Sequence, residues 1–98
     1  MTKPLLLEGG EYDVARKDDL RAELEQTEPH SDVVLDLAKT DYLDCSCIGV
    51  LIAKLHEWRE RHPDTHLRLR NVAPSITRML GILELDRLFV IENVQATG

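Results

Sequence analysis

The chain of 98 residues is long enough for one compact domain, and its hydrophobic content of 43% allows a small core. Its formal net charge of -6 argues against nucleic acid and anionic membrane surfaces as partners, because both attract basic patches. The sequence contains no apolar run of about 18 residues, which is the length needed to span a bilayer. Two cysteines at i and i+2 make a poor disulfide framework, so we expect a cytoplasmic protein with free thiols.

The N-terminal part of the sequence predicts two short extended segments and a helix. Residues 4–14 (PLLLEGGEYDV) indicate a short strand that turns at Gly9 and Gly10 and resumes as a second extended piece. Residues 15–27 (ARKDDLRAELEQT) predict a helix with a weak apolar face. Acidic residues in its first turn suit the positive end of a helix dipole.

A buried strand and an amphipathic helix come next. Residues 32–38 (DVVLDLA) are an almost continuous apolar run, which is typical of a strand buried on both faces. Residues 39–46 (KTDYLDCS) indicate a loop. Apolar residues then recur along one stripe of a helix: Ile48, Leu51, Ile52 and Leu55. We expect this helix to end near Arg61, because Pro63 stops it, and Trp58 extends its stripe.

The C-terminal part predicts a strand, a helix and a last strand. Residues 65–72 (THLRLRNV) alternate apolar and polar side chains, as a half-buried strand does. Pro74 suits the first turn of the following helix, and residues 87–94 (RLFVIENV) predict the last strand. Strands that alternate with helices predict an α/β fold with right-handed crossovers and a mostly parallel sheet.

Loops that leave the carboxyl ends of parallel strands often carry the functional site of such folds. The loop after the strand 32–38 carries Asp44, Cys45, Ser46 and Cys47, directly ahead of the amphipathic helix. This loop is therefore the strongest candidate for the functional site.

Three segments resemble the STAS domain family of the anti-sigma factor antagonist type. Residues 33–55 (VVLDLAKTDYLDCSCIGVLIAKL) are similar to its apolar strand, short loop and Asp-Ser-Ser-Gly-Leu-Gly-Val-Leu run. Residues 10–24 (GEYDVARKDDLRAEL) resemble its Gly-Glu-x-Asp segment, and residues 68–91 (RLRNVAPSITRMLGILELDRLFVI) resemble its C-terminal strand, helix and LDRLF ending. The resemblance covers roughly residues 9–92.

The resemblance implies a fold and a function. The expected fold is a small mixed, mostly parallel sheet of four to five strands, with helices packed mainly on one side. A single domain would span residues 1–98, with a core of about 5–92. In the family, an anti-sigma factor that is also a serine-protein kinase binds the unphosphorylated domain, which frees the sigma factor. Phosphorylation of a serine at a helix N-terminus then breaks the complex by adding about two negative charges to the interface.

The family pattern maps onto the loop residue by residue. Asp44 falls on the family Asp, Cys45 on the first Ser, Ser46 on the second Ser, Cys47 on the first Gly and Gly49 on the second Gly. A thiol therefore replaces the usual phosphoacceptor. Ser46 is a candidate acceptor, unless its hydroxyl caps the helix. Asp44 is a helix cap, a group that orients the partner, or both.

We expect these five residues to form the partner-binding switch loop, within residues 41–50, and Asp36 to fix that loop. Cys47 is expected to be a buried residue of the first helical turn. Glu84 stands where the family usually has Gly after the third helix. If that position is left-handed, Glu84 costs about 1 kcal/mol.

Two other functions stay open. A STAS subunit of a lipid-transport ABC complex, or a scaffold, needs no phosphorylated loop, which suits Cys45. A thiol-based redox sensor would use Cys45 with Cys47 at the positive end of the helix. However, Asp41 and Asp44 disfavour a thiolate there, and no local His or Arg activates a nucleophile. We expect no enzyme activity and no cofactor. We also expect no metal site, since the four histidines lack metal-ligand spacing. A homodimer stays open.

Overall fold

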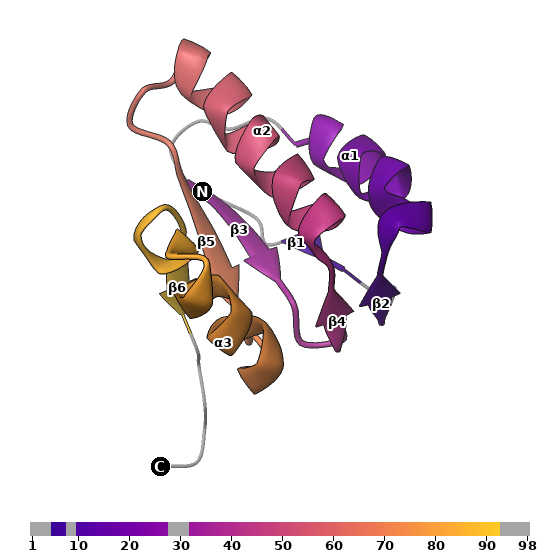
Figure 1. Ribbon diagram of the computed structural model, residues 1–98. Coiled ribbons are helices and arrows are strands. Elements are labelled where there is room, and N and C mark those ends of the chain that lie inside the picture. The colour runs from indigo at the N-terminus through magenta and orange to yellow at the C-terminus, as the bar shows by residue number, and fades with distance from the viewer. Residues whose placement is uncertain (1–4, 8–9, 28–31, 93–98) are drawn as a thin grey trace.

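The computed structural model describes residues 5–7, 10–27 and 32–92 of the chain. Its strands are β1 (Leu5–Leu6), β2 (Glu11–Tyr12), β3 (Asp32–Asp36), β4 (Tyr42–Leu43), β5 (His66–Arg70) and β6 (Val90–Glu92). Its helices are α1 (Lys17–Glu25), α2 (Cys45–Arg61) and α3 (Pro74–Ile82), with 3-10 turns η1 (Val14–Arg16) and η2 (Leu85–Arg87). Figure 1 shows α1 and α2 side by side, as their mutual contacts require.

The strands form two sheets, and every pairing between the described strands is parallel. The larger sheet has the order β1-β3-β5-β6, and the smaller one pairs β2 with β4. The register of the larger sheet aligns Leu5, Leu35, Leu69 and Ile91 in one row across all four strands. This row gives the sheet an apolar inner face, which confirms the predicted α/β fold.

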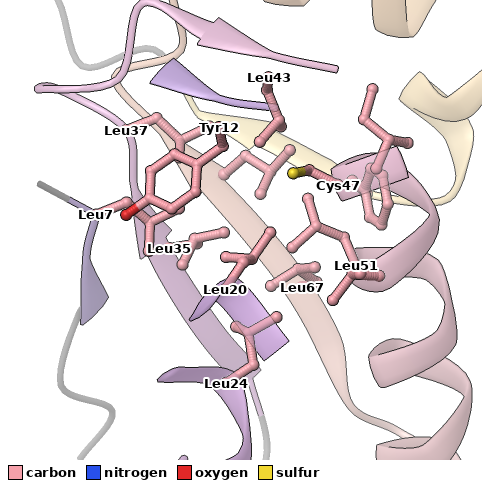
Figure 2. Close-up of a cluster of buried hydrophobic side chains, with 14 of the residues drawn as sticks. Leu7, Tyr12, Leu20, Leu24, Leu35, Leu37, Leu43, Cys47, Leu51 and Leu67 are labelled. Atoms are coloured by element: carbon pink, nitrogen blue, oxygen red, sulfur yellow. The ribbon is translucent and has the colours of Figure 1, made fainter. Parts of the chain in front are cut away.

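The inner face packs against the helices in one core. Leu51 and Leu55 of α2 are fully buried there, as the predicted stripe requires, together with Leu20 and Leu24 of α1. Figure 2 shows how buried side chains from α1, α2 and the strands meet around Tyr12 and Cys47. Trp58 is only 6% exposed, so it extends the stripe as expected.

The outer face of the larger sheet carries charged residues instead. Arg68 of β5 donates from Nε to Asp32 Oδ2 of β3 and from Nη1 to Glu92 Oε2 of β6, both at 2.7 Å. These side chains are partly exposed. Polar side chains of this kind alternate along β5 with buried leucines, and this alternation is the pattern that predicted a half-buried strand. The helices therefore cover mainly the opposite face.

Two predicted boundaries are wrong. The loop predicted over residues 39–46 contains β4, and α2 already begins at Cys45. The last strand begins at Val90 rather than at residue 87, because the amides of Leu88 and Phe89 close a turn onto Leu85 O. Residues 93 and 94, which belonged to the same prediction, lie outside the described residues.

Candidate functional site

The first turn of α2 lies at the end of the chain segment that leaves the carboxyl end of β3. Asp44 precedes it with an extended backbone (φ -84°, ψ 175°), and its Oδ1 accepts a hydrogen bond from Cys47 N at 3.0 Å. Asp44 is therefore the N-cap of α2, which satisfies one of the free amides at the helix start. Ser46 lies inside the helix, so its hydroxyl does not serve as this cap.

The expected switch residues differ in how accessible they are. Cys45 and Gly49 are exposed, Asp44 and Ser46 are half-buried, and Cys47 is fully buried. Cys45 and Gly49 are four residues apart, so they share one face of the helix. A Cβ added to Gly49 would meet no atom within 4 Å, so packing within the chain does not require a glycine there. The absence of a side chain at Gly49 leaves this helix face accessible to a binding partner.

Cys47 belongs to the core rather than to the accessible surface. Burial, together with the nearby carboxylate of Asp44, raises the pKa of the Cys47 thiol to about 11. Its Sγ donates to the backbone oxygen of Asp13 at 3.4 Å. At neutral pH the thiol therefore stays protonated, while Cys45, two residues earlier, is exposed to solvent. This arrangement gives no support to chemistry that uses both thiols as one reactive pair.

Asp36 lies at the end of β3, where it joins two segments. Its Oδ1 accepts hydrogen bonds from Ala38 N at 2.9 Å and from Asn71 Nδ2 at 3.1 Å. The first bond shapes the start of the loop that leads to α2, and the second ties this start to the residue after β5. These contacts are the kind that the expected loop-fixing role needs.

Sequence reasoning missed the contribution of β2 and β4 to this region. The pairing of Glu11 with Tyr42 brings the two short strands together, and Asp44 N donates to Tyr12 O at 3.0 Å. Tyr42 is 50% exposed beside the start of α2. The sequence feature that could have indicated this contact is the Gly-Glu-x-Asp segment. It lies next to the loop only because residues about 30 positions apart pair with each other.

A separate cleft of about 250 Å³ lies at the other end of α2. Residues of α1 and α2 line it, including Glu25, Lys54, Glu57 and Trp58. The side chain of Lys54 is almost fully buried, and its Nζ lies 3.7 Å from Glu25 Oε2 and 3.5 Å from Glu57 Oε1. The charge of Lys54 is therefore paired with carboxylates within the chain.

Two further features, a metal-binding cluster and a membrane-spanning helix, are absent from the described ranges. No group of three or more His, Cys, Asp or Glu side chains there could hold a metal ion. No helix in these ranges is both long and apolar enough to cross a membrane.

Comparisons with known proteins identify the family to which the chain belongs. The family model described as "Mlab, STAS domain" matches residues 6–92, which is most of the chain. The chain therefore belongs to the STAS domain family, as the three similar segments predicted. No protein with a curated description matches the sequence.

A crystal structure shows the same fold. It is that of a protein from Thermotoga maritima described as a candidate anti-sigma factor antagonist. The two structures superpose with a TM-score of 0.72 at 15% sequence identity, over 96% of this chain and 81% of that chain. At this identity the likeness establishes the shared architecture.

Proposed function

We propose that the protein is a docking module rather than an enzyme, and that it acts in the cytoplasm as an anti-sigma factor antagonist. Its partner is an anti-sigma factor of the serine-protein kinase type, which it binds through residues 41–50 and the following helix α2. The observation that carries this proposal is the position of Cys45, which is exposed as the first residue of α2 in a STAS domain. Asp44, Ser46 and Gly49 surround it at the same helix start.

The replacement of the usual phosphoserine by Cys45 changes how such a switch operates. A thiol is not an acceptor for a serine kinase, so phosphorylation at position 45 does not end the complex. Ser46 is half-buried and is the remaining candidate acceptor in this turn. A phosphate there would put about two negative charges next to the Asp44 carboxylate, and docking would have to desolvate them.

The proposal is tested by placing a fixed charge at Cys45. The experiment compares wild-type protein with Cys45→Asp and Cys45→Ser for binding to purified kinase-type anti-sigma factors of the source cell, by calorimetry. We expect Cys45→Asp to weaken binding at least about tenfold, because a charge at a docked interface is desolvated without a partner. Cys45→Ser keeps a small neutral side chain and should stay within about threefold of wild type.

The control is Ala22→Asp, which adds the same charge to an exposed position on α1. It should bind like the wild-type protein. Equal affinities of Cys45→Asp and Cys45→Ser would contradict the proposed site, and no binding of wild-type protein to any of these anti-sigma factors would contradict the proposed partner.

A second function is favoured by the same thiol. A STAS subunit of a lipid-transport ABC complex, or a scaffold, would bind constantly and would need no phosphoacceptor at position 45. In that case the protein purified from its own cell should carry a transport ATPase with it, in a complex that kinase treatment leaves intact. Co-purification of a sigma regulator in place of an ATPase would count against this alternative.

A further inference from the structure

Two hydrogen bonds join the segment after β2 to the first turn of α2. The first runs from Asp44 N to Tyr12 O at 3.0 Å and uses only backbone atoms. The second runs from Cys47 Sγ to Asp13 O at 3.4 Å and depends on the side chain at position 47. Glycine, which the family pattern has at position 47, would leave the first bond in place but could not make the second.

Asp13 organises the short turn that follows it. Its backbone oxygen also accepts from Arg16 N at 2.9 Å, and its Oδ1 accepts from Ala15 N at 3.0 Å. Both bonds hold η1 in shape. A group that holds Asp13 in place therefore holds the whole turn against α2.

The surroundings of Cys47 suit such a role. The residue is fully buried, and Figure 2 shows its sulfur among the core side chains of Tyr12, Leu43 and Leu51. Because burial keeps the thiol protonated, its S–H remains a donor at neutral pH. A thiol is a weak donor, so its contribution to the free energy of the turn is small but directional.

We propose that Cys47 is a positioning residue, whose thiol holds Asp13 against the first turn of α2 so that η1 and the start of α2 form one surface. The positioning of η1 is a property of the free protein. The consequence for docking rests on the function proposed above.

The positioning role is tested by amide hydrogen exchange of the free protein, measured by NMR. The probes are the amides of Ala15 and Arg16, each expressed relative to the amides of β5. Cys47→Ala removes the donor, and we expect these two amides to exchange about threefold faster, as fits the loss of one weak hydrogen bond. Cys47→Ser restores a donor and should return the exchange rates toward wild type.

Ile76→Val is the matched control, because it also removes core volume, from a residue of α3 that is 2% exposed. It should leave the relative exchange of Ala15 and Arg16 unchanged. Unchanged exchange in Cys47→Ala, or equally fast exchange in Cys47→Ala and Cys47→Ser, would overturn the proposal.

A second measurement separates this proposal from the function on which its consequence rests. Binding of the same variants to the anti-sigma factor should follow the exchange rates, with Cys47→Ala about threefold weaker than wild type and Cys47→Ser close to it. If the exchange rates respond but affinity does not, the link between positioning and docking is refuted. If no anti-sigma factor binds even the wild-type protein, the proposed function fails, while the exchange rates still decide the role of Cys47.

Discussion

Glu84 adopts a left-handed backbone (φ 59°, ψ 27°) directly after α3. This conformation is unfavourable for residues with a Cβ and free of that penalty for glycine. We expect Glu84→Gly to raise the free energy of unfolding by about 0.5 to 1 kcal/mol, measured by urea denaturation. Glu84→Ala keeps the Cβ and should give no such gain, so an equal gain from both variants would point to removal of the charge instead.

At the scale of single residues, the sequence was informative where a local rule applied. The family resemblance placed a glycine at position 84 and raised the question of a left-handed backbone there, and the structure shows that conformation. The burial of Cys47 was expected because free cysteines are often buried, and that of Trp58 because it extends the helix stripe; both are confirmed. The contact of Cys47 with Asp13 could not be predicted, because no local pattern connects residues 34 positions apart.

At the scale of elements, the N-cap of α2 links helix stability to the exposed turn. Replacement of Asp44 by Ala removes the acceptor for Cys47 N, and we expect a loss of about 1 kcal/mol in the free energy of unfolding. Asp44→Asn keeps an acceptor and should retain most of the stability. Thermal unfolding followed by circular dichroism measures both.

Ser46→Ala serves as the neighbouring control, because Ser46 lies within the helix and is not its cap. It should unfold close to wild type. If Ser46→Ala were as destabilising as Asp44→Ala, the assignment of Asp44 as the cap would be wrong.

The elements that could be predicted are those with their own periodicity. Each of β3 and β5 shows its pattern within five consecutive residues, and the apolar stripe of α2 shows its pattern within seventeen. The strand β4 has only two residues, and it exists because Tyr42 and Leu43 pair with β2. Its pairing also sets where α2 begins, so both the strand and the helix start escaped a reading based on neighbouring residues.

At the scale of the whole molecule, the outer face of the sheet makes stability depend on pH. The hydrogen bond from Arg68, with its positive charge and His66 nearby, lowers the pKa of Asp32 below its ordinary value of 3.8. A carboxylate with a lowered pKa in the folded state stabilises the fold fully above the unfolded-state value. This contribution is lost as the pH falls below 3.8 toward the folded-state pKa.

Urea denaturation at several pH values between neutral and about 3 tests this dependence. Wild-type protein should lose more stability on acidification than Asp32→Asn, in which the side chain can no longer ionise. Arg68→Gln should also flatten the dependence, because it removes the first cause of the shift. Parallel curves for wild type and Asp32→Asn would show that other carboxylates govern acid stability.

The sheet order described above has a consequence for how the chain folds. Each pairing of described strands joins residues at least 22 positions apart, as for Arg68 with Val90, and the others are separated by 30 or more. A parallel pair needs a crossover, so none of these strands can begin as a hairpin. Loop closure must precede any gain from pairing, and the first productive nucleus has to enclose a helix between two distant strands. Slow, all-or-none folding is the expected kinetic signature of this topology.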